Sequence, residues 1–225
     1  MSYRVYDKSE DKTKNDDFQD MLAEVLEWGL KPAFVTGDSG YAGVKNLKKV
    51  KQHPMGFLFA VESNRTVSLE KGAWTHVQKL EVPEAGMNVW LRDFGEVKWF
   101  RTWLKEQPRH YIVWLPDSSH DEHFGIHDFQ TLHDQYWKIE QYHRVIKQIC
   151  SIEEFQVRTK TPILNHIFAA LCGYVQIQKM QFDDLIRNAY HWKQDLYQEV
   201  VAAFVRAFLR GKEHLNPQFP TTVNA

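Results

Sequence analysis

Residues 32–43, PAFVTGDSGYAG, decide the fold class of this chain. The run from Ala33 to Thr36 follows a proline and stops at glycine and aspartate, which is typical of a short buried strand ending in a turn. Upstream, residues 15–29 carry apolar side chains at helical spacing, with aspartates in the first turns. The stretch therefore predicts a helix, a strand, a turn and a second helix over residues 41–50, a unit typical of α/β proteins.

The rest of the chain changes from strand-like to helical patterns. Residues 3–6 alternate apolar and polar side chains, which predicts a short strand ahead of the first helix. From Gly56 onward, strand-like runs of five to nine residues are separated by Gly and Pro turns. Three long helical patterns follow Pro116, near residues 125–150, 161–182 and 189–211.

These patterns predict an α/β fold with a β-rich block inserted into it and a helical carboxy-terminal part. The expected parts are a partial core over 1–55, the β-rich insertion over 56–116, the helical part over 117–215 and a tail over 216–225. The sequence shows no internal repeat and no clear linker between them.

The composition fits one folded, soluble protein. Of the 225 residues, 43% are hydrophobic and 25% charged, and no apolar run is long enough to cross a membrane. We therefore expect a cytosolic protein that does not associate with membranes. Two cysteines, Cys150 and Cys172, are too few for a disulfide framework or a four-cysteine zinc site, and we interpret both as buried thiols.

The net charge of −1 gives the chain as a whole no basic excess that would indicate a nucleic-acid partner. The charge is uneven, however, because residues 141–225 carry ten Lys and Arg against seven Asp and Glu. The carboxy-terminal third is therefore the part in which contacts with an acidic partner are expected.

Asp38 is the first candidate functional residue. It stands one glycine beyond the short strand, and open α/β sheets present their ligands and catalytic groups at the carboxyl ends of strands. The alternative is a structural aspartate that caps the turn before the next helix. Spacing alone leaves both interpretations open.

Glu140 is the second candidate. Helical steps of three and four place it on one face with bases and aromatic residues, namely His133, Tyr136, His143 or Arg144, and Lys147. A carboxylate among cations stays ionised and suits a site for a metal ion and a phosphate together. The alternative is a solvated face on which Glu140 and Arg144 form an ordinary i, i+4 ion pair.

The sequence has no motif for a zinc site or for a nucleophilic serine or cysteine. Zinc needs three or four converging ligands, and the histidines at 120, 123, 127 and 133 come without HExxH or paired CxxC spacing, so we interpret them as loop and helix-start residues. No GxSxG sequence marks a nucleophilic serine, and both cysteines stand in apolar stretches.

Four segments taken together resemble the DDE transposases of bacterial insertion sequences. The segments are VTGDSGYAG (35–43), ESNR (62–65), LRDFGEVKWFR (91–101) and WKIEQYHRVIKQICSIEEFQVRTKTPILNHIFAALCGYVQIQ (137–178). The similar group has an RNase H-like core with a β-rich insertion and a last catalytic acid in a Tyr-x2-Arg-x3-Glu-x6-Lys helix. The resemblance runs from Tyr3 to about Gln178.

The resemblance implies roles for individual residues. Asp38 falls on the second catalytic aspartate and Glu140 on the catalytic glutamate, both ligands of Mg²⁺ or Mn²⁺, and Lys147 falls on a lysine that contacts DNA. Arg65, at the entry to the insertion, is a weaker candidate for DNA contact. The implied partners are transposon ends and target DNA, with a second copy or a full-length transposase as possible protein partners.

The sequence departs from the family motif at two positions of the helix. His133 replaces the motif tyrosine and Tyr136 replaces the motif arginine. Arg144, one turn beyond Glu140, offers a substitute guanidinium for the phosphate.

A larger departure concerns the first catalytic aspartate. In the family it stands on the first strand of the core, whereas residues 3–6 here correspond to the third strand. We therefore expect a core that lacks its first strands, its first aspartate and any amino-terminal DNA-binding domain.

The expected function is that of the carboxy-terminal part of a DDE transposase, inactive alone and associated with the bacterial nucleoid. The alternatives are a non-catalytic remnant that binds DNA or poisons oligomers of the intact enzyme, and an unrelated RNase H-like nuclease.

Overall fold

The structure is a computed structural model that describes residues 3–5, 11–70, 72–116 and 124–213. The chain divides into two compact units, one ending at Glu140 and the other beginning at Gln141. Each unit is described by itself below.

The amino-terminal unit contains a mixed sheet and the helices that cover it. Its elements are α1 (Lys14–Glu27), β1 (Phe34–Gly37), the 3-10 turn η1 (Ser39–Tyr41), α2 (Val44–Lys51), β2 (Gly56–Val61), β3 (Thr66–Ser68), β4 (Trp74–His76), the 3-10 turn η2 (Val77–Lys79), β5 (Met87–Leu91), β6 (Gly95–Leu104), β7 (Gln107–Trp114) and the first part of α3 (Ile126–Gln148). The second unit holds the end of α3, then α4 (Lys160–Phe182) and α5 (Ala189–Glu213).

The seven strands form one sheet in the order β1-β2-β7-β6-β5-β3-β4. β1 and β2 are parallel, with Phe34 opposite Gly56, whereas the other ladders are antiparallel. Parallel strands require a crossover connection, and η1 and α2 supply it here.

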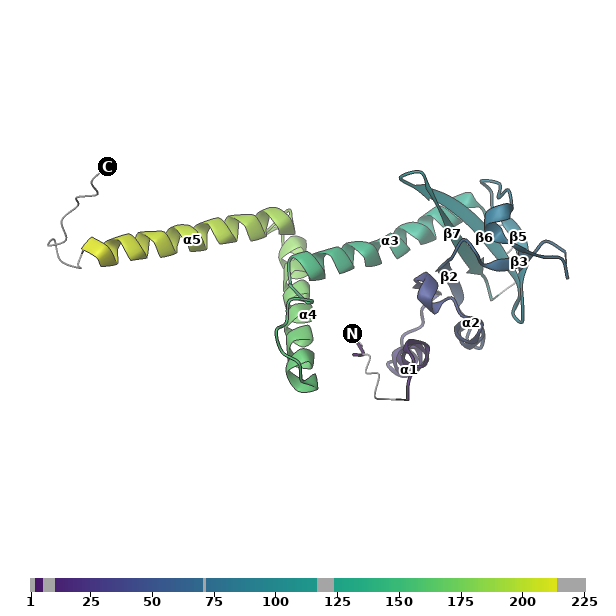
Figure 1. Cartoon of the computed structure of the whole chain (residues 1–225), viewed down its shortest axis with the longest axis horizontal. Coiled ribbons are helices and arrows are strands. Elements are labelled where there is room, and N and C mark those ends of the chain that lie inside the picture. Colours follow the sequence, from purple (N-terminus) through teal and green to yellow (C-terminus); the bar gives the residue numbers. More distant parts are fainter. Residues whose placement is uncertain (1–2, 6–10, 71, 117–123, 214–225) are drawn as a thin grey trace, which may run out of the picture. The chain divides into compact units, whose positions relative to one another are not determined.

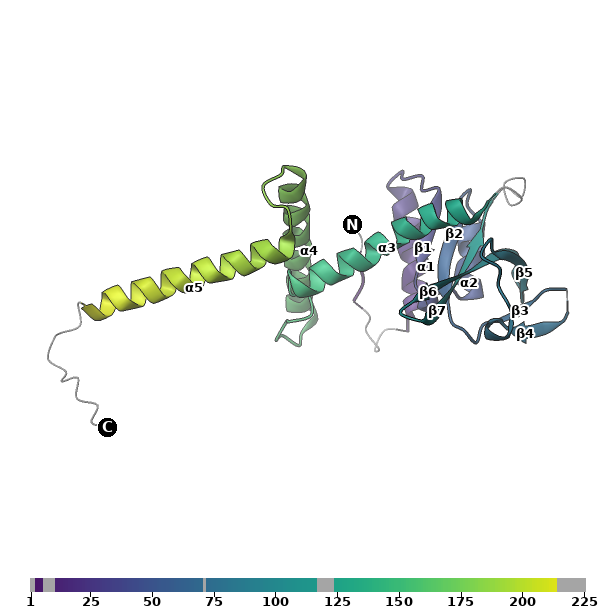
Figure 2. The same ribbon diagram turned by 90° about the horizontal axis from the view of Figure 1, so that it is seen from above.

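Alternating side chains on β2 bury both faces of the sheet. Phe57, Phe59 and Val61 face the larger core, which α1 and α2 complete with Leu22 and Leu47. Figures 1 and 2 show α1 and α2 side by side against the sheet. Residues of the opposite face, including Leu58, Phe100 and Tyr111, pack against α3 through Phe129 and Tyr136.

The start of α3 is held on the sheet by specific contacts. The rings of Phe129 and Phe100 stack with centroids 4.2 Å apart and an interplanar angle of 9°. The ammonium group of Lys98 on β6 donates to the carbonyl of Phe124, and Asp128 Oδ2 accepts from the Gly125 amide at 2.9 Å. These contacts fix which side of α3 faces the sheet in this unit.

The predicted α/β class is correct, and the helices lie within a few residues of their predicted ranges. The predicted strand over 3–6 is wrong for residues 3–5, which are irregular, and Tyr6 lies outside the described residues. Four alternating residues do not make a strand without a ladder partner, and the Arg4 guanidinium instead donates to Glu24 of α1 at 2.8 Å. The predicted limits of the insertion stay a prediction.

The interpretation of both cysteines as buried thiols is also wrong for Cys172. It is exposed on α4, on a different side from the buried Ala170, Leu171 and Ile177. Cys150 is half-buried just after α3, where burial raises the pKa of its thiol.

Candidate active site

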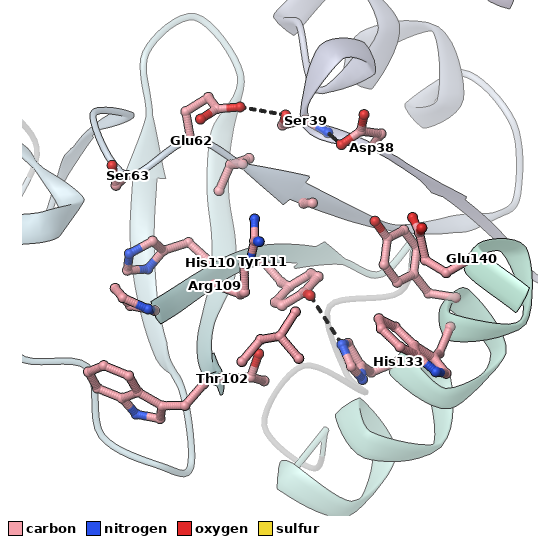
Figure 3. A pocket seen from close by; sticks show the side chains of 17 residues that line it. Asp38, Ser39, Glu62, Ser63, Thr102, Arg109, His110, Tyr111, His133 and Glu140 are labelled. Atoms are coloured by element: carbon pink, nitrogen blue, oxygen red, sulfur yellow. Dashed lines mark hydrogen bonds between the residues drawn. The ribbon is translucent and has the colours of Figure 1, made fainter. Parts of the chain in front are cut away.

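A pocket of about 480 Å³ lies at the carboxyl ends of the parallel strands β1 and β2. Its lining comes from four segments of the amino-terminal unit, namely the β1–η1 turn, the end of β2, the β6–β7 hairpin and α3. Figure 3 shows the labelled side chains that face it. Asp38 and Glu140, far apart in the sequence, line this one pocket.

Asp38 follows β1 directly and caps η1. Its Oδ1 accepts the amide of Ser39 at 2.6 Å, so the capping role considered from the sequence is present, and the side chain is exposed at the pocket. The preceding Gly37 allows close packing under the turn, because a Cβ there would lie 2.4 Å from Cε1 of the buried Phe59. Because Gly37 has no side chain, the turn that carries Asp38 packs directly on the core at the edge of the sheet.

A hydrogen bond ties this turn to the end of β2. The hydroxyl of Ser39 donates to Glu62 Oε1 at 2.6 Å, as Figure 3 shows. Glu62 is thus a third acid on the pocket wall, but one whose carboxylate already accepts a hydrogen bond that positions the Asp38 turn.

Glu140 stands on α3 and is the last residue of the amino-terminal unit, and its side chain lines the pocket. His133, Tyr136 and Trp137 precede it on the pocket-facing side of the helix. Because the Phe129 and Phe100 stack fixes the helix, the exposed Glu140 carboxylate is directed to the pocket rather than to the far side of the sheet. Figure 3 shows Asp38 and Glu140 in the same part of the pocket.

Tyr136 lies within the electrostatic reach of both carboxylates. Its pKa is raised to about 12, chiefly by burial, with Tyr111, Glu140 and Asp38 contributing in the same direction and Arg109 opposing them. The phenol therefore stays protonated at neutral pH and remains a hydrogen-bond donor beside two acids.

Arg109 and Tyr111 of β7 are pocket residues that the sequence interpretation missed. Arg109 is the only Lys or Arg among the described residues lining the pocket, and its charge partly opposes the rise that burial causes in the pKa of Tyr111 and of Tyr136. Tyr111 Oη lies 3.1 Å from His133 Nε2. Only the register of β7 against β2 could have indicated Arg109 and Tyr111. In that register their neighbour His110 lies opposite Val61, at the end of β2 where the pocket lies.

The three predicted DNA contacts lie elsewhere. Arg65 is half-buried at the turn before β3, and burial lowers the pKa of its guanidinium. Arg144 and Lys147 are exposed on the part of α3 that belongs to the second unit, and Lys147 Nζ lies 2.7 Å from Glu153 Oε1. None of the three lines the pocket, as far as its described walls extend.

The donor set suits a hard divalent cation, since carboxylate oxygens are the ligands that Mg²⁺ takes in proteins. Asp38 and Glu140 supply two such groups. No group of three or more His, Cys, Asp or Glu side chains arranged to hold a metal exists within the described ranges. Of the histidines considered from the sequence, His120 and His123 lie outside the described residues.

The chain matches one protein-family model. The model of the family described as the transposase DDE domain matches residues 2–176. The chain therefore belongs to the DDE transposase family, whose members generally use divalent metal ions and act on DNA. None of the curated proteins and none of the solved structures in the comparison matches the chain. In the part of the chain that the structure describes, no helix is long and apolar enough to span a membrane.

Proposed function

We propose that this pocket is the site of DNA cleavage and strand transfer by metal-dependent phosphoryl transfer, with Asp38 and Glu140 as ligands of Mg²⁺ or Mn²⁺. The observation that carries the proposal is the meeting of these two carboxylates on one pocket in a chain of this family. Asp38 directly follows β1 and Glu140 stands on α3, and both elements pack in the sheet unit, which is the rigid support that metal ligands require.

The protein's own groups have distinct tasks in this proposal. Ser39 and Glu62 orient the turn that bears Asp38, and the packing of α3 orients Glu140. The protonated phenol of Tyr136 donates to a phosphate oxygen, and Arg109 neutralises phosphate charge at the same pocket. When bound, divalent metal supplies activation of the attacking hydroxyl and stabilisation of the leaving oxygen.

Arg109 is a better candidate than Arg144 for the phosphate contact that the family motif assigns to the arginine replaced by Tyr136. Arg109 lines the pocket with both acids, and its charge acts on Tyr136 itself. A guanidinium there serves a phosphate as the motif arginine would, although it comes from β7 instead of α3.

DNA that extends beyond the pocket contacts the basic side chains of the carboxy-terminal part. Lys147 and Arg144 contact the backbone of transposon ends or target DNA, with Arg65 as a further contact on the amino-terminal unit. Such contacts release counterions and so weaken with salt. A cytoplasmic location at the nucleoid follows from this choice of partner.

We propose further that the described residues alone do not support cutting. Two-metal chemistry needs ligands that hold two ions about 3.5–4 Å apart, and two carboxylates rarely do so. The support is the lack of a three-ligand group within the described ranges. The same observation favours a second candidate function, a non-catalytic protein that binds DNA or combines with an intact transposase.

A metal-binding and nicking assay separates these functions. Mn²⁺ is titrated by calorimetry into the chain, Asp38→Asn, Glu140→Gln and the exposed control Glu81→Gln, and nicking of supercoiled DNA is followed with Mg²⁺. Weak Mn²⁺ binding that both site variants lose, with no nicking by any form, supports the metal site and the non-cutting chain. Nicking that Glu140→Gln abolishes shows that these acids suffice, and equal Mn²⁺ binding by all four proteins excludes the site.

A further inference from the structure

The hydroxyl of Tyr111 on β7 lies between two other side chains of the pocket wall. Its Oη is 3.1 Å from Nε2 of His133 on α3, as the dashed line in Figure 3 shows. Burial raises the pKa of Tyr111, and a side-chain hydrogen bond with Thr102 of β6 opposes that rise. All three side chains line the pocket, and Tyr111 is only 6% exposed. Thr102, Tyr111 and His133 are together called the Tyr111 network below.

The register of the sheet and the packing of α3 bring the Tyr111 network together. Phe100 lies opposite Tyr111 in the β6–β7 ladder, so Thr102, two residues further along β6, faces the same side of the sheet. The rings of Tyr111 and His133 meet edge to face, with centroids 4.9 Å apart. Phe129, one turn earlier on α3, also packs on Tyr111, with centroids 5.8 Å apart. Packed rings therefore hold the two hydrogen-bonding atoms in place.

Both titratable side chains of the network are uncharged at neutral pH. Burial lowers the pKa of His133, while Asp134 acts in the opposite direction, and burial raises the pKa of Tyr111. A neutral imidazole carries one proton, so one ring nitrogen donates a hydrogen bond and the other accepts one. The hydrogen bond made by one nitrogen therefore decides which nitrogen holds the proton.

The chemistry of the three groups favours one direction of hydrogen bonding. The phenol is the most acidic hydroxyl of the network and the unprotonated imidazole nitrogen is its most basic atom, so the Tyr111 hydroxyl donates to Nε2 of His133. The Thr102 hydroxyl then donates to the Tyr111 oxygen, in agreement with its opposing effect on the Tyr111 pKa. In the reverse direction the weaker acid, an imidazole N–H, would donate to the weaker base, a phenol oxygen.

This direction leaves the proton of His133 on Nδ1. No hydrogen bond joins Nδ1 to another residue in the part of the chain that the structure describes. The half-buried side chain lines the same pocket as Asp38 and Glu140, so its N–H can donate to a ligand there. An uncharged donor suits such a site because, unlike a lysine or an arginine, it does not repel a divalent cation held by the two carboxylates.

We propose that Tyr111 is a positioning residue that fixes His133 in the neutral tautomer with its proton on Nδ1, and that this N–H donates to a phosphate oxygen of DNA in the pocket. The choice of phosphate rests on the proposed function, whereas the tautomer is a property of the chain alone. A contact that served only to hold α3 on the sheet would not require the proton on one particular nitrogen.

The tautomer is read from a long-range proton–nitrogen NMR spectrum of the full chain with isotopically labelled histidine nitrogens. The signals of His133 are those absent from the His133→Gln spectrum. At neutral pH we expect a protonated Nδ1 and an unprotonated Nε2, and in Tyr111→Phe a mixture of both tautomers. Tyr174→Phe, which removes a half-buried hydroxyl from the second unit, is the matched control and should leave these signals unchanged. A protonated Nε2 in the native chain, or no change in Tyr111→Phe, overturns the proposal.

Two variants of His133 then identify the donor in a binding assay with Mg²⁺ and a fluorescently labelled duplex. The amide nitrogen of asparagine takes the place of Nδ1, and that of glutamine the place of Nε2. His133→Gln should weaken binding about tenfold, the lower end for a hydrogen bond to a charged group, whereas His133→Asn should keep most of the native affinity. Equal affinities of the two variants overturn the donor role of Nδ1. A native chain that shows the expected tautomer but binds no DNA overturns the proposed function and the phosphate ligand, and supports the role of Tyr111.

Discussion

The ammonium group of Lys147 lies 2.7 Å from the carboxylate of Glu153. The chain turns back after α3 through Ser151, whose φ is 55°, and the Ile152 amide donates to the Ile146 carbonyl. This turn returns Glu153 to the last turn of the helix. The lysine proposed to contact DNA therefore holds an acidic partner within its own unit, and a phosphate would compete with that carboxylate.

The competition gives a prediction for DNA affinity. Lys147→Ala should weaken DNA binding and reduce the slope of log affinity against log salt by about one. Glu153→Gln should strengthen binding by up to about fivefold, because an exposed ion pair is worth at most about 1 kcal/mol. Fluorescence anisotropy with a labelled duplex at several salt concentrations measures both.

Glu154→Gln is the matched control for that experiment, since it removes the same charge from the neighbouring exposed residue. Equal gains from the two glutamine variants would show that only general charge matters and that the Lys147 pair has no role in binding.

The phenol of Tyr136 reports on the acid pair without any activity assay. Neutralising either acid, with Asp38→Asn or Glu140→Gln, should lower the Tyr136 pKa from about 12, because a negative charge that opposes the phenolate is removed. Burial, the larger cause, remains, so the pKa should stay above the usual 10. Ultraviolet difference titration of tyrosinate against Tyr136→Phe isolates this residue. If both site variants leave the titration unchanged, the two acids do not converge there.

Gly37 is predicted to be intolerant of a side chain. Gly37→Ala places a Cβ 2.4 Å from the fully buried Phe59 ring and should destabilise the unit by about 1–3 kcal/mol through overpacking. Gly40→Ala, where a Cβ meets nothing within 4 Å, should have a much smaller effect. Urea unfolding of the two variants measures the difference, and equal unfolding midpoints would refute the close packing beneath the Asp38 turn.

His110 predicts loss of stability in acid. It is 4% exposed, its two ring nitrogens lack hydrogen-bond partners among the described residues, and burial, with Arg101 adding to it, lowers its pKa. The unfolded chain therefore binds the proton more readily. Stability from the neutral ring is complete above about pH 6.5 and is lost as the pH falls toward the lower folded pKa.

The variant His110→Phe should flatten this acid dependence relative to the native chain, because it keeps a ring against Trp99 and removes the titrating group. Urea midpoints between pH 5 and 8 provide the measurement. An unchanged slope in the variant would assign the acid sensitivity to other groups.

Local patterns predicted the elements whose own residues determine them. The three long helices near 125–150, 161–182 and 189–211 have strong periodicity and lie where it indicated. The strand over 3–6 failed because alternation over four residues records only a local preference, and a strand also needs a partner that the pattern does not name.

Of the proposed site, the sequence indicated the two acids. Asp38 was singled out by its place after a short strand and Glu140 by its helical face, and the family resemblance added their catalytic roles. Their meeting on one pocket depends on the docking of α3. Arg109 escaped because nothing local distinguishes it from other exposed arginines, and β7 reaches the pocket only through its pairing with β2. Long-range register of this kind carries no signal within a short window of sequence.

The ladder between β2 and β7 joins Phe57 to Trp114, and its place in the sheet bears on how the protein folds. The hairpins β5–β6 and β6–β7 each form by closing a short loop. The β2–β7 ladder forms only when the much longer chain segment between β2 and β7 closes into a loop. Because closing a longer loop costs more conformational entropy, we expect this ladder to form late in folding. The pocket is lined by residues of both strands of this ladder, β2 and β7. Its assembly therefore belongs to the last stage of folding, and hydrogen exchange of the β2 amides during refolding should lag behind that of the hairpins.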